Sequence, residues 1–186
     1  SLTVGHSEAM RVGRTVPPAA APIGLGEIAR GLSGILRGET EVERLRQELQ
    51  AFYRVRHACL VSSGKTALLL ILQALKELKP DRDEVLVPAY TCYSVPSAIV
   101  RAGLKVRLCD IDPETLDFDF QALPDAIRAS GRHLLAVIPV HLYGLLADIE
   151  RLKGLVDSSH VFVIEDAAQA MGGLDASPKP GTLGDV

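Results

Sequence analysis

The period of the apolar positions changes several times along the chain. Short apolar runs, typical of buried strands, alternate with segments whose apolar residues recur every three or four positions, as on one face of a helix. Strands are expected at 57–61, 84–87, 105–109, 133–138 and 161–165, and helices at 40–53, 67–78, 95–102, 120–129 and 146–156. This alternation predicts an α/β fold of three layers, in which a mostly parallel sheet lies between helices.

The first part of the chain has a different character. Residues 1–22 are polar or small and rich in proline, so we expect an N-terminal arm that is flexible. Residues 23–36 have helical spacing weakened by glycines. The run Gly24-Leu25-Gly26-Glu27-Ile28-Ala29 matches a dinucleotide-binding fingerprint, but that motif requires a buried strand directly before it, and the prolines argue against one. We therefore reject a dinucleotide site and expect residues 23–186 to form the main domain.

Composition and charge exclude several classes of function. The chain has 186 residues, 47% of them hydrophobic, and a net charge of -3, which gives no reason to expect nucleic acid or an anionic membrane as partner. No apolar run approaches the length of a membrane span. The three widely spaced cysteines suit a reducing, cytoplasmic location, and the histidines lack the paired spacing of a metal site.

An acid and an amide follow the last expected strand. Asp166 comes just after the apolar run 161–164, and Gln169 lies three residues further on. In open parallel sheets, ligands bind at the carboxyl ends of the strands. An acid there, followed by small residues and an amide, suits a flat ring held through hydrogen bonds at its edge. The alternative is that Asp166 caps the next helix, and this segment alone leaves both interpretations open.

A second candidate lies where an expected strand turns into a helix. The sequence Ser62-Ser63-Gly64-Lys65-Thr66 places small and hydroxyl residues at a helix N-terminus, whose free N–H groups and positive dipole end favour an anion. It is not a Walker loop, because the spacing of that motif is absent. The alternative is an ordinary helix cap by Ser62 or Ser63, with Lys65 in solvent.

Two further loops follow expected strands. The first contains Tyr90, Cys92 and Tyr93, of which either tyrosine could stack on a planar ligand. Nothing beside Cys92 in the sequence lowers its thiol pKa, so we do not assign it as a nucleophile. The second loop contains His141 and Tyr143, which are candidate ring or substrate contacts, although a lone histidine is more often structural.

Taken together, these segments resemble one protein family. The matching residues are Ser63-Gly64 with Thr66-Ala67-Leu68, Val87-Pro88-Ala89-Tyr90-Thr91, Asp110-Ile111-Asp112-Pro113-Glu114-Thr115 with Leu116-Asp117, Pro139-Val140-His141-Leu142-Tyr143-Gly144, Ile164-Glu165-Asp166-Ala167-Ala168-Gln169-Ala170 and Gly181-Thr182-Leu183-Gly184-Asp185. Their order and spacing closely resemble the DegT/DnrJ/EryC1/StrS family of pyridoxal-phosphate aminotransferases, over roughly residues 23–186. Each motif alone is weak, but the set is specific.

The resemblance implies the large domain of an aspartate-aminotransferase-like (fold type I) enzyme, of which this chain would be the N-terminal part. It implies the cofactor pyridoxal 5'-phosphate, a homodimer, and transfer of an amino group from glutamate or glutamine to a keto sugar, mostly carried on a nucleotide. Such reactions belong to the biosynthesis of cell-surface polysaccharides or secondary metabolites.

The resemblance also assigns roles to residues of the cofactor site. Asp166 would hold the pyridine nitrogen protonated, and Gln169 would contact the side of the ring that carries the 3-oxygen. Gly64, Lys65 and Thr66 would receive the phosphate. The remaining assignment is Cys92, which stands where many members have the aromatic residue that stacks on the ring.

Three features depart from the family pattern. Lys65 stands where members commonly have threonine or serine, and Cys92 where an aromatic residue is common, which leaves the stacking residue open. The Schiff-base lysine is expected beyond Val186, so the chain looks cut and should by itself be inert or nearly so. This absence motivates an alternative function, a non-catalytic module that binds pyridoxal phosphate or another phosphorylated ligand, or pairs with another subunit.

Overall fold

The computed structural model describes residues 23–35, 38–156, 160–171 and 179–186. They fall into two compact units that divide between Gln47 and Glu48. The expected arm, residues 1–22, lies outside the described residues, so its flexibility and the domain boundary at residue 23 stay predictions.

The described part of the first unit is mostly helical. Helix α1 spans Leu25–Ile35, and helix α2, Gly38–Tyr53, begins in this unit and continues into the second. The apolar side chains of α1 lie on one face, as their spacing predicts, yet α1 buries none of its residues.

The second unit is built on a parallel sheet. Its strands β1 (Glu84–Pro88), β2 (Lys105–Cys109), β3 (Leu134–Val137) and β4 (Phe162–Val163) lie in the order β2-β1-β3-β4. Every pairing is parallel, and β1 pairs with both β2 and β3. Because the chain leaves β1 toward one side of the sheet and later returns on the other, the gap between the ends of β1 and β3 is the topological switch point, where such sheets bind ligands.

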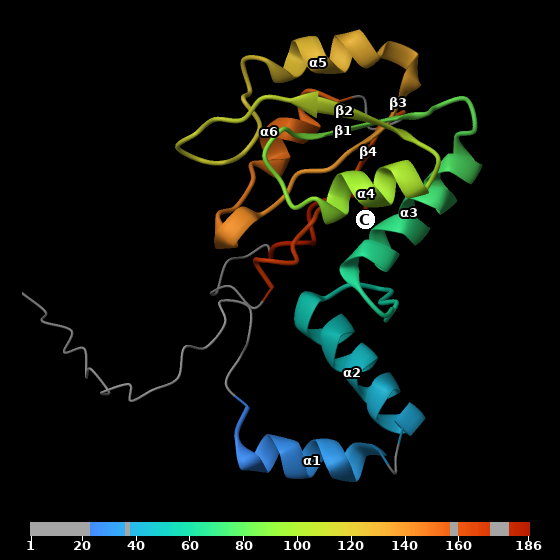
Figure 1. Cartoon of the computed structure of the whole chain (residues 1–186), viewed down its shortest axis with the longest axis vertical. Helices are drawn as coiled ribbons and strands as arrows, with labels where there is room; N and C mark the ends of the chain where they lie inside the picture. The colour runs from blue at the N-terminus through green and yellow to red at the C-terminus, as the bar shows by residue number, and fades with distance from the viewer. Residues whose placement is uncertain (1–22, 36–37, 157–159, 172–178) are drawn as a thin grey trace, which may run out of the picture. The chain divides into compact units, whose positions relative to one another are not determined.

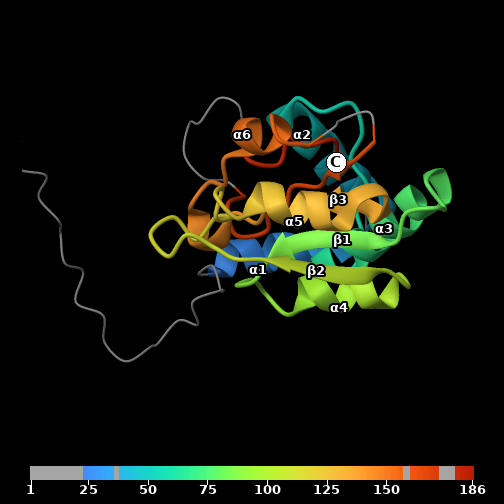
Figure 2. The ribbon, with the colours of Figure 1, turned by 90° about the horizontal axis from the view of Figure 1, so that it is seen from above.

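Helices cover both faces of the sheet. Helices α3 (Gly64–Leu78) and α4 (Ser94–Arg101) lie on one face, and α5 (Leu123–Ser130) and α6 (Ile149–Lys153) on the other, as Figures 1 and 2 show. Two short 3-10 turns, Gly131–His133 and Leu142–Gly144, flank β3. The predicted three-layer α/β fold is confirmed.

The side chains of the strands explain why helices cover both faces of the sheet. In β1, Val85 and Val87 pack into the apolar cluster under α3 and α4, whereas Leu86 packs into the cluster under α5. All three are fully buried. This uninterrupted apolar run is what a strand covered on both faces requires, since successive side chains point to opposite sides of the sheet.

One predicted strand is wrong. Residues 57–61 form no strand, and Leu60 and Val61 remain exposed. A run of this length is too short to specify a strand by itself, because a strand also needs a neighbour for its backbone hydrogen bonds. Helix α6 is also shorter than the predicted 146–156, and β4 shorter than 161–165. No helix in the described ranges is long and apolar enough to cross a membrane.

Candidate functional site

A pocket of about 380 Å³ lies at the carboxyl ends of the strands. Three elements line it: the first two turns of α3, the first turn of α4, and the segment that follows β4. Their lining residues include Gly64, Lys65, Ser94, Asp166 and Ala168. The two segments that the sequence suggested separately, 62–66 and 164–169, therefore meet at one site.

The first turn of α3 forms one wall of this pocket and suits an anion. Ser63 is the N-cap, and its Oγ accepts the Thr66 N–H at 3.2 Å. The N–H groups of Gly64 and Lys65 precede the first intrahelical hydrogen bond, so they can donate to a ligand. A Cβ built on Gly64 would meet no atom within 4 Å, so the absence of a side chain leaves open space at this wall. Lys65 forms no ion pair with any described residue, which leaves its charge available.

The hydroxyl of Thr66 has a partner within the helix cap. Its Oγ1 lies 2.9 Å from the Oγ of Ser63, within the cap, and Thr66 does not line the pocket. The cap that the sequence left as the alternative is thus present, and it leaves Gly64 and Lys65 at the pocket wall.

Asp166 forms another wall of the pocket and is held there by its backbone. Its N–H donates to the carbonyl of Pro139 at 3.0 Å, and its own carbonyl accepts the His141 N–H at 3.0 Å. These bonds fix Asp166 beside the end of β3. One carboxylate oxygen, Oδ1, accepts the Ala168 N–H at 3.1 Å, and Oδ2 has no partner within the described chain. One oxygen therefore remains for a ligand.

Cys92 and Gln169 are near this pocket but do not line it. Ser94 donates to the sulfur of Cys92 over 3.1 Å, and this bond lowers the thiol pKa, against the opposing effects of burial and of the Asp166 charge. The sequence indicated no such neighbour. Gln169 accepts the backbone N–H of Tyr143 through its Oε1 at 2.7 Å.

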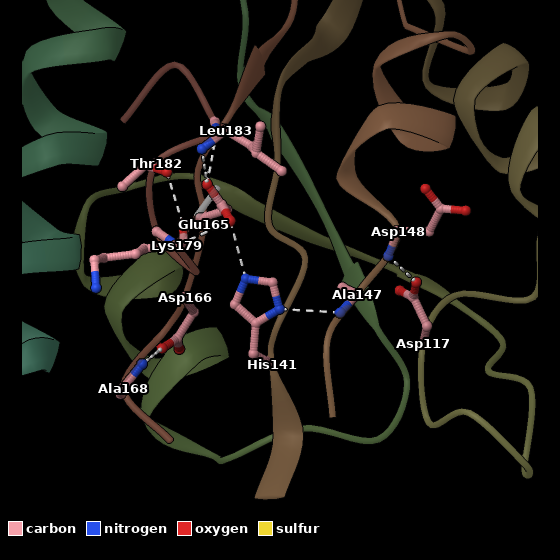
Figure 3. Close-up of polar contacts among 12 residues, drawn as sticks. Asp117, His141, Ala147, Asp148, Glu165, Asp166, Ala168, Lys179, Thr182 and Leu183 are labelled. Atoms are coloured by element: carbon pink, nitrogen blue, oxygen red, sulfur yellow. Dashed lines mark hydrogen bonds and ion pairs between the residues drawn. The ribbon is translucent and has the colours of Figure 1, made fainter. Parts of the chain in front are cut away.

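A buried histidine and glutamate lie beside Asp166 (Figure 3). The Nδ1 of His141 faces the Ala147 N–H at 3.0 Å, and its Nε2 lies 3.0 Å from Oε1 of Glu165. Because Nδ1 must accept the Ala147 N–H, the proton is on Nε2 and is donated to Glu165. The side chains of His141 and Glu165 are only 2% and 1% exposed. His141 is therefore a buried structural residue, which links Glu165 to the backbone of Ala147.

The carboxylate of Glu165 also binds the segment near Val186. Its Oε1 accepts the Gly181 N–H at 3.0 Å, and Oε2 accepts those of Leu183 and Gly184 at 2.7 and 2.6 Å. Burial by itself raises the pKa of this carboxyl, but the bonds from His141 and the three N–H groups outweigh it and lower the pKa. Glu165 thus anchors residues 181–184 against the segment between β4 and Asp166.

Sequence reasoning missed two features of this region. An acid at position 165 in an otherwise apolar run was a signal, since a buried carboxylate needs several donors, but the donors themselves are remote in sequence. The second feature is a contact between the hydroxyls of Tyr90 and Tyr143, 2.9 Å apart across the switch point. Nothing in the spacing of the two tyrosines predicts it.

The chain is similar to known proteins over most of its length. It is 35% identical to a GDP-perosamine synthase of Vibrio cholerae, over 78% of this chain and 38% of that protein. It is also 35% identical to an L-glutamine:2-deoxy-scyllo-inosose aminotransferase of Streptomyces kanamyceticus, over 83% of this chain and 35% of that protein. The chain therefore spans less than half the length of these curated relatives.

Solved structures also resemble this chain in fold and are likewise matched over less than half of their own length. An Escherichia coli GDP-4-keto-6-deoxy-D-mannose-3-dehydratase with bound hydrated PLP matches with a TM-score of 0.79 and 26% identity, over 91% of this chain and 45% of that chain. A 3-amino-5-hydroxybenzoic acid synthase matches with a TM-score of 0.74 and 30% identity, over 88% and 43%.

The family model places these similarities under one description. It matches residues 27–186, which include the first turn of α3, the loops after β1 and β3, and Asp166. The resemblance inferred from the sequence motifs is thereby confirmed. This chain belongs to the DegT/DnrJ/EryC1/StrS aminotransferase family.

Proposed function

We propose that the chain is the N-terminal part of the large domain of a pyridoxal-phosphate-dependent aminotransferase that acts on a keto sugar. The observation that carries this proposal is the pocket in which the Asp166 carboxylate and the free N-terminus of α3 are brought together. Two relatives, a GDP-perosamine synthase and an inosose aminotransferase, support a sugar or cyclitol ketone as amino acceptor.

The residues present fit pyridoxal phosphate. The N–H groups of Gly64 and Lys65, together with the Lys65 ammonium, would hold the phosphate. The unpartnered Oδ2 of Asp166 would accept the pyridinium N–H and so keep the ring protonated. When bound, the cofactor supplies an electron sink at the carbon that exchanges the amino group. Glu165 and His141 hold the backbone next to Asp166, and the Ala168 N–H orients its carboxylate.

Catalysis requires a Schiff-base lysine, and none of the lysines that the structure describes is free at the pocket for that role. Lys65 lines the wall assigned to the phosphate, whereas Lys76 and Lys105 bind Gly103 and Asp83 elsewhere. Lys153 contacts the carbonyl of Leu183, and Lys179 lies over the ring of Phe52. We therefore expect the 186-residue chain alone to bind cofactor but to transfer amino groups slowly or not at all.

The partners follow from the same proposal. Glutamate or glutamine would be the amino donor, and a nucleotide-linked keto sugar the acceptor, in the biosynthesis of cell-surface polysaccharides or secondary metabolites. We place the protein in the cytoplasm, as a homodimer. Cys92 would lie near one face of the ring, where a thiol stacks more weakly than an aromatic residue.

Binding of pyridoxamine 5'-phosphate tests the site, because this form of the cofactor needs no lysine. Isothermal titration of the chain should show binding that Asp166→Asn weakens about tenfold or more, since a charged hydrogen bond is lost. Asp81→Asn, at an exposed carboxylate before β1, is the matched control and should leave the affinity unchanged. Absence of binding to the unmodified chain would refute the proposal.

Activity distinguishes an aminotransferase from a non-catalytic module. The natural full-length protein, supplied with glutamate and a panel of nucleotide-linked keto sugars, should release 2-oxoglutarate and an amino sugar. The Asp166→Asn variant should lose this activity. If the full-length protein binds the cofactor tightly and transfers no amino group to any acceptor, the module is the better interpretation.

A further inference from the structure

Tyr143 has an unusual backbone conformation for its residue type. Its φ and ψ are 55° and 20°, in the left-handed region, within the short turn Leu142–Gly144 that follows β3. A residue other than glycine is rarely found there, and holding it there costs about 1 kcal/mol or more. The side chain of Tyr143 is exposed, with 68% of the residue surface accessible, so burial of the ring does not maintain this conformation.

Two hydrogen bonds maintain it instead. The backbone N–H of Tyr143 donates to Oε1 of Gln169 at 2.7 Å, and the phenol of Tyr143 lies 2.9 Å from that of Tyr90. Tyr90 follows β1 and Tyr143 follows β3, so the second bond joins the two loops on either side of the switch point. The strained turn is thus held at both its backbone and its side chain.

The first of these bonds decides the orientation of the Gln169 amide. A backbone N–H can only donate, so the amide atom that faces it must be the oxygen. The amide NH2 group of Gln169 is consequently on the opposite side and has no acceptor within the described chain. Gln169 lies in the turn closed by the bond from the Ala170 N–H to the Ala167 carbonyl, directly after Asp166 and next to Ala168, which lines the pocket.

We propose that Tyr143 is a positioning residue, whose left-handed backbone directs its N–H to Gln169 so that the Gln169 NH2 donates to the 3-oxygen of the cofactor. This inference rests on the proposed function, because it requires pyridoxal or pyridoxamine phosphate in the pocket. The 3-oxygen carries negative charge in the bound cofactor, and a donor held in place stabilises that charge. Tyr90 acts one step further away, by holding the ring of Tyr143.

Two substitutions of similar size separate the backbone of Tyr143 from its ring. Asparagine tolerates the left-handed region, whereas a β-branched valine strongly disfavours it. Both remove the phenol and its bond to Tyr90. Tyr143→Val should therefore lose the N–H bond to Gln169, and Tyr143→Asn should keep it.

The ligand supplies the second control. Pyridoxamine 5'-phosphate and its 3-deoxy analogue differ only in the oxygen that Gln169 is proposed to bind. By titration calorimetry, Tyr143→Val and Gln169→Leu should each weaken binding of pyridoxamine phosphate about tenfold and leave binding of the 3-deoxy analogue unchanged. Tyr143→Asn should bind both ligands like the unmodified chain. The variant that combines Tyr143→Val with Gln169→Leu should bind pyridoxamine phosphate no more weakly than Gln169→Leu alone, because both changes remove the same contact with the 3-oxygen.

The outcomes separate failure of this inference from failure of the proposed function. If pyridoxamine phosphate does not bind the unmodified chain, the proposed function is refuted, and this inference with it. Suppose instead that pyridoxamine phosphate binds the unmodified chain. If Tyr143→Val then weakens binding of both ligands equally, or has the same affinities as Tyr143→Asn, Tyr143 does not position Gln169. Gln169 is exposed, so Gln169→Leu reports on the 3-oxygen contact even if Tyr143→Val disturbs the turn.

Discussion

Replacing Glu165 by glutamine tests whether the buried carboxylate holds the site together. The substitution keeps the shape of the side chain but exchanges one oxygen for an NH2 group. The two oxygens of Glu165 now accept four donors: the Nε2 of His141 and the N–H groups of Gly181, Leu183 and Gly184. The single amide oxygen of a glutamine can accept two of these donors. Its NH2 group then faces the other two donors and cannot accept from them.

His141 cannot relieve this conflict. If its proton moved to Nδ1, then Nε2 could accept from the new NH2, but Nδ1 would face the Ala147 N–H, which it now accepts at 3.0 Å. We take about 4 kcal/mol for Glu165→Gln, because two buried donors lose their acceptor and each costs about 1–3 kcal/mol.

Urea unfolding, followed by circular dichroism, measures this loss. With a slope of about 2 kcal/mol/M, the midpoint should fall by about 2 M. Glu114→Gln, at an exposed glutamate, is the matched control and should change the midpoint by little. A midpoint for Glu165→Gln within about 0.3 M of the unmodified chain would show that the carboxylate contributes no such stability.

The same carboxylate predicts a pH dependence. The folded-state pKa of Glu165 is lowered, so its contribution is fully present above the ordinary glutamate pKa of about 4.3 and is lost as the pH falls through the lowered value. The difference in unfolding free energy between the unmodified chain and Glu165→Gln should therefore be constant near neutral pH and shrink below about pH 4. A difference that grows on acidification would contradict the assigned sign.

Maleimide at pH 7 should label the exposed Cys59 and Cys92 quickly and the buried Cys109 slowly. Burial and nearby carboxylates raise the pKa of the Cys109 thiol to about 11, so little reactive thiolate forms. Peptide mapping measures the three labelling rates, and equal rates would contradict this prediction. Pyridoxamine phosphate should slow labelling of Cys92 only, and unchanged labelling at saturating ligand would place the cofactor elsewhere. Gly184→Ala should destabilise the fold by about 1–3 kcal/mol in urea unfolding, because its Cβ would lie 2.9 and 3.0 Å from two carbonyl oxygens. In Gly64→Ala the new Cβ meets no atom within 4 Å, so this variant should keep full stability while it weakens cofactor binding. If Gly184→Ala and Gly64→Ala are equally stable, the chain relaxes around residue 184.

Much of the fold follows from local patterns. The apolar run of β1 and the helical period of α3 each identify an element, because strands and helices repeat their side-chain directions every two and every 3.6 residues. Residue types alone predict an anion site in the turn before α3, since glycine and hydroxyl residues at a helix N-terminus leave donors free. These inferences need only neighbours along the chain.

The same reasoning failed at residues 57–61. The run His57-Ala58-Cys59-Leu60-Val61 has strand-like composition, but no described strand pairs with it, and its last residues stay exposed. Pairing depends on which remote segment lies alongside, and composition does not contain that information.

The sequence by itself determined the order of the layers, the family, and the candidate residues Gly64, Lys65 and Asp166. Only the tertiary structure decided which atom each polar side chain presents to a ligand. The proton on His141 is fixed by Ala147 and Glu165, and the amide of Gln169 by Tyr143, a residue 26 positions away. Hydrogen-bond direction depends on donors and acceptors that the fold brings together over such distances, so no local pattern can specify it.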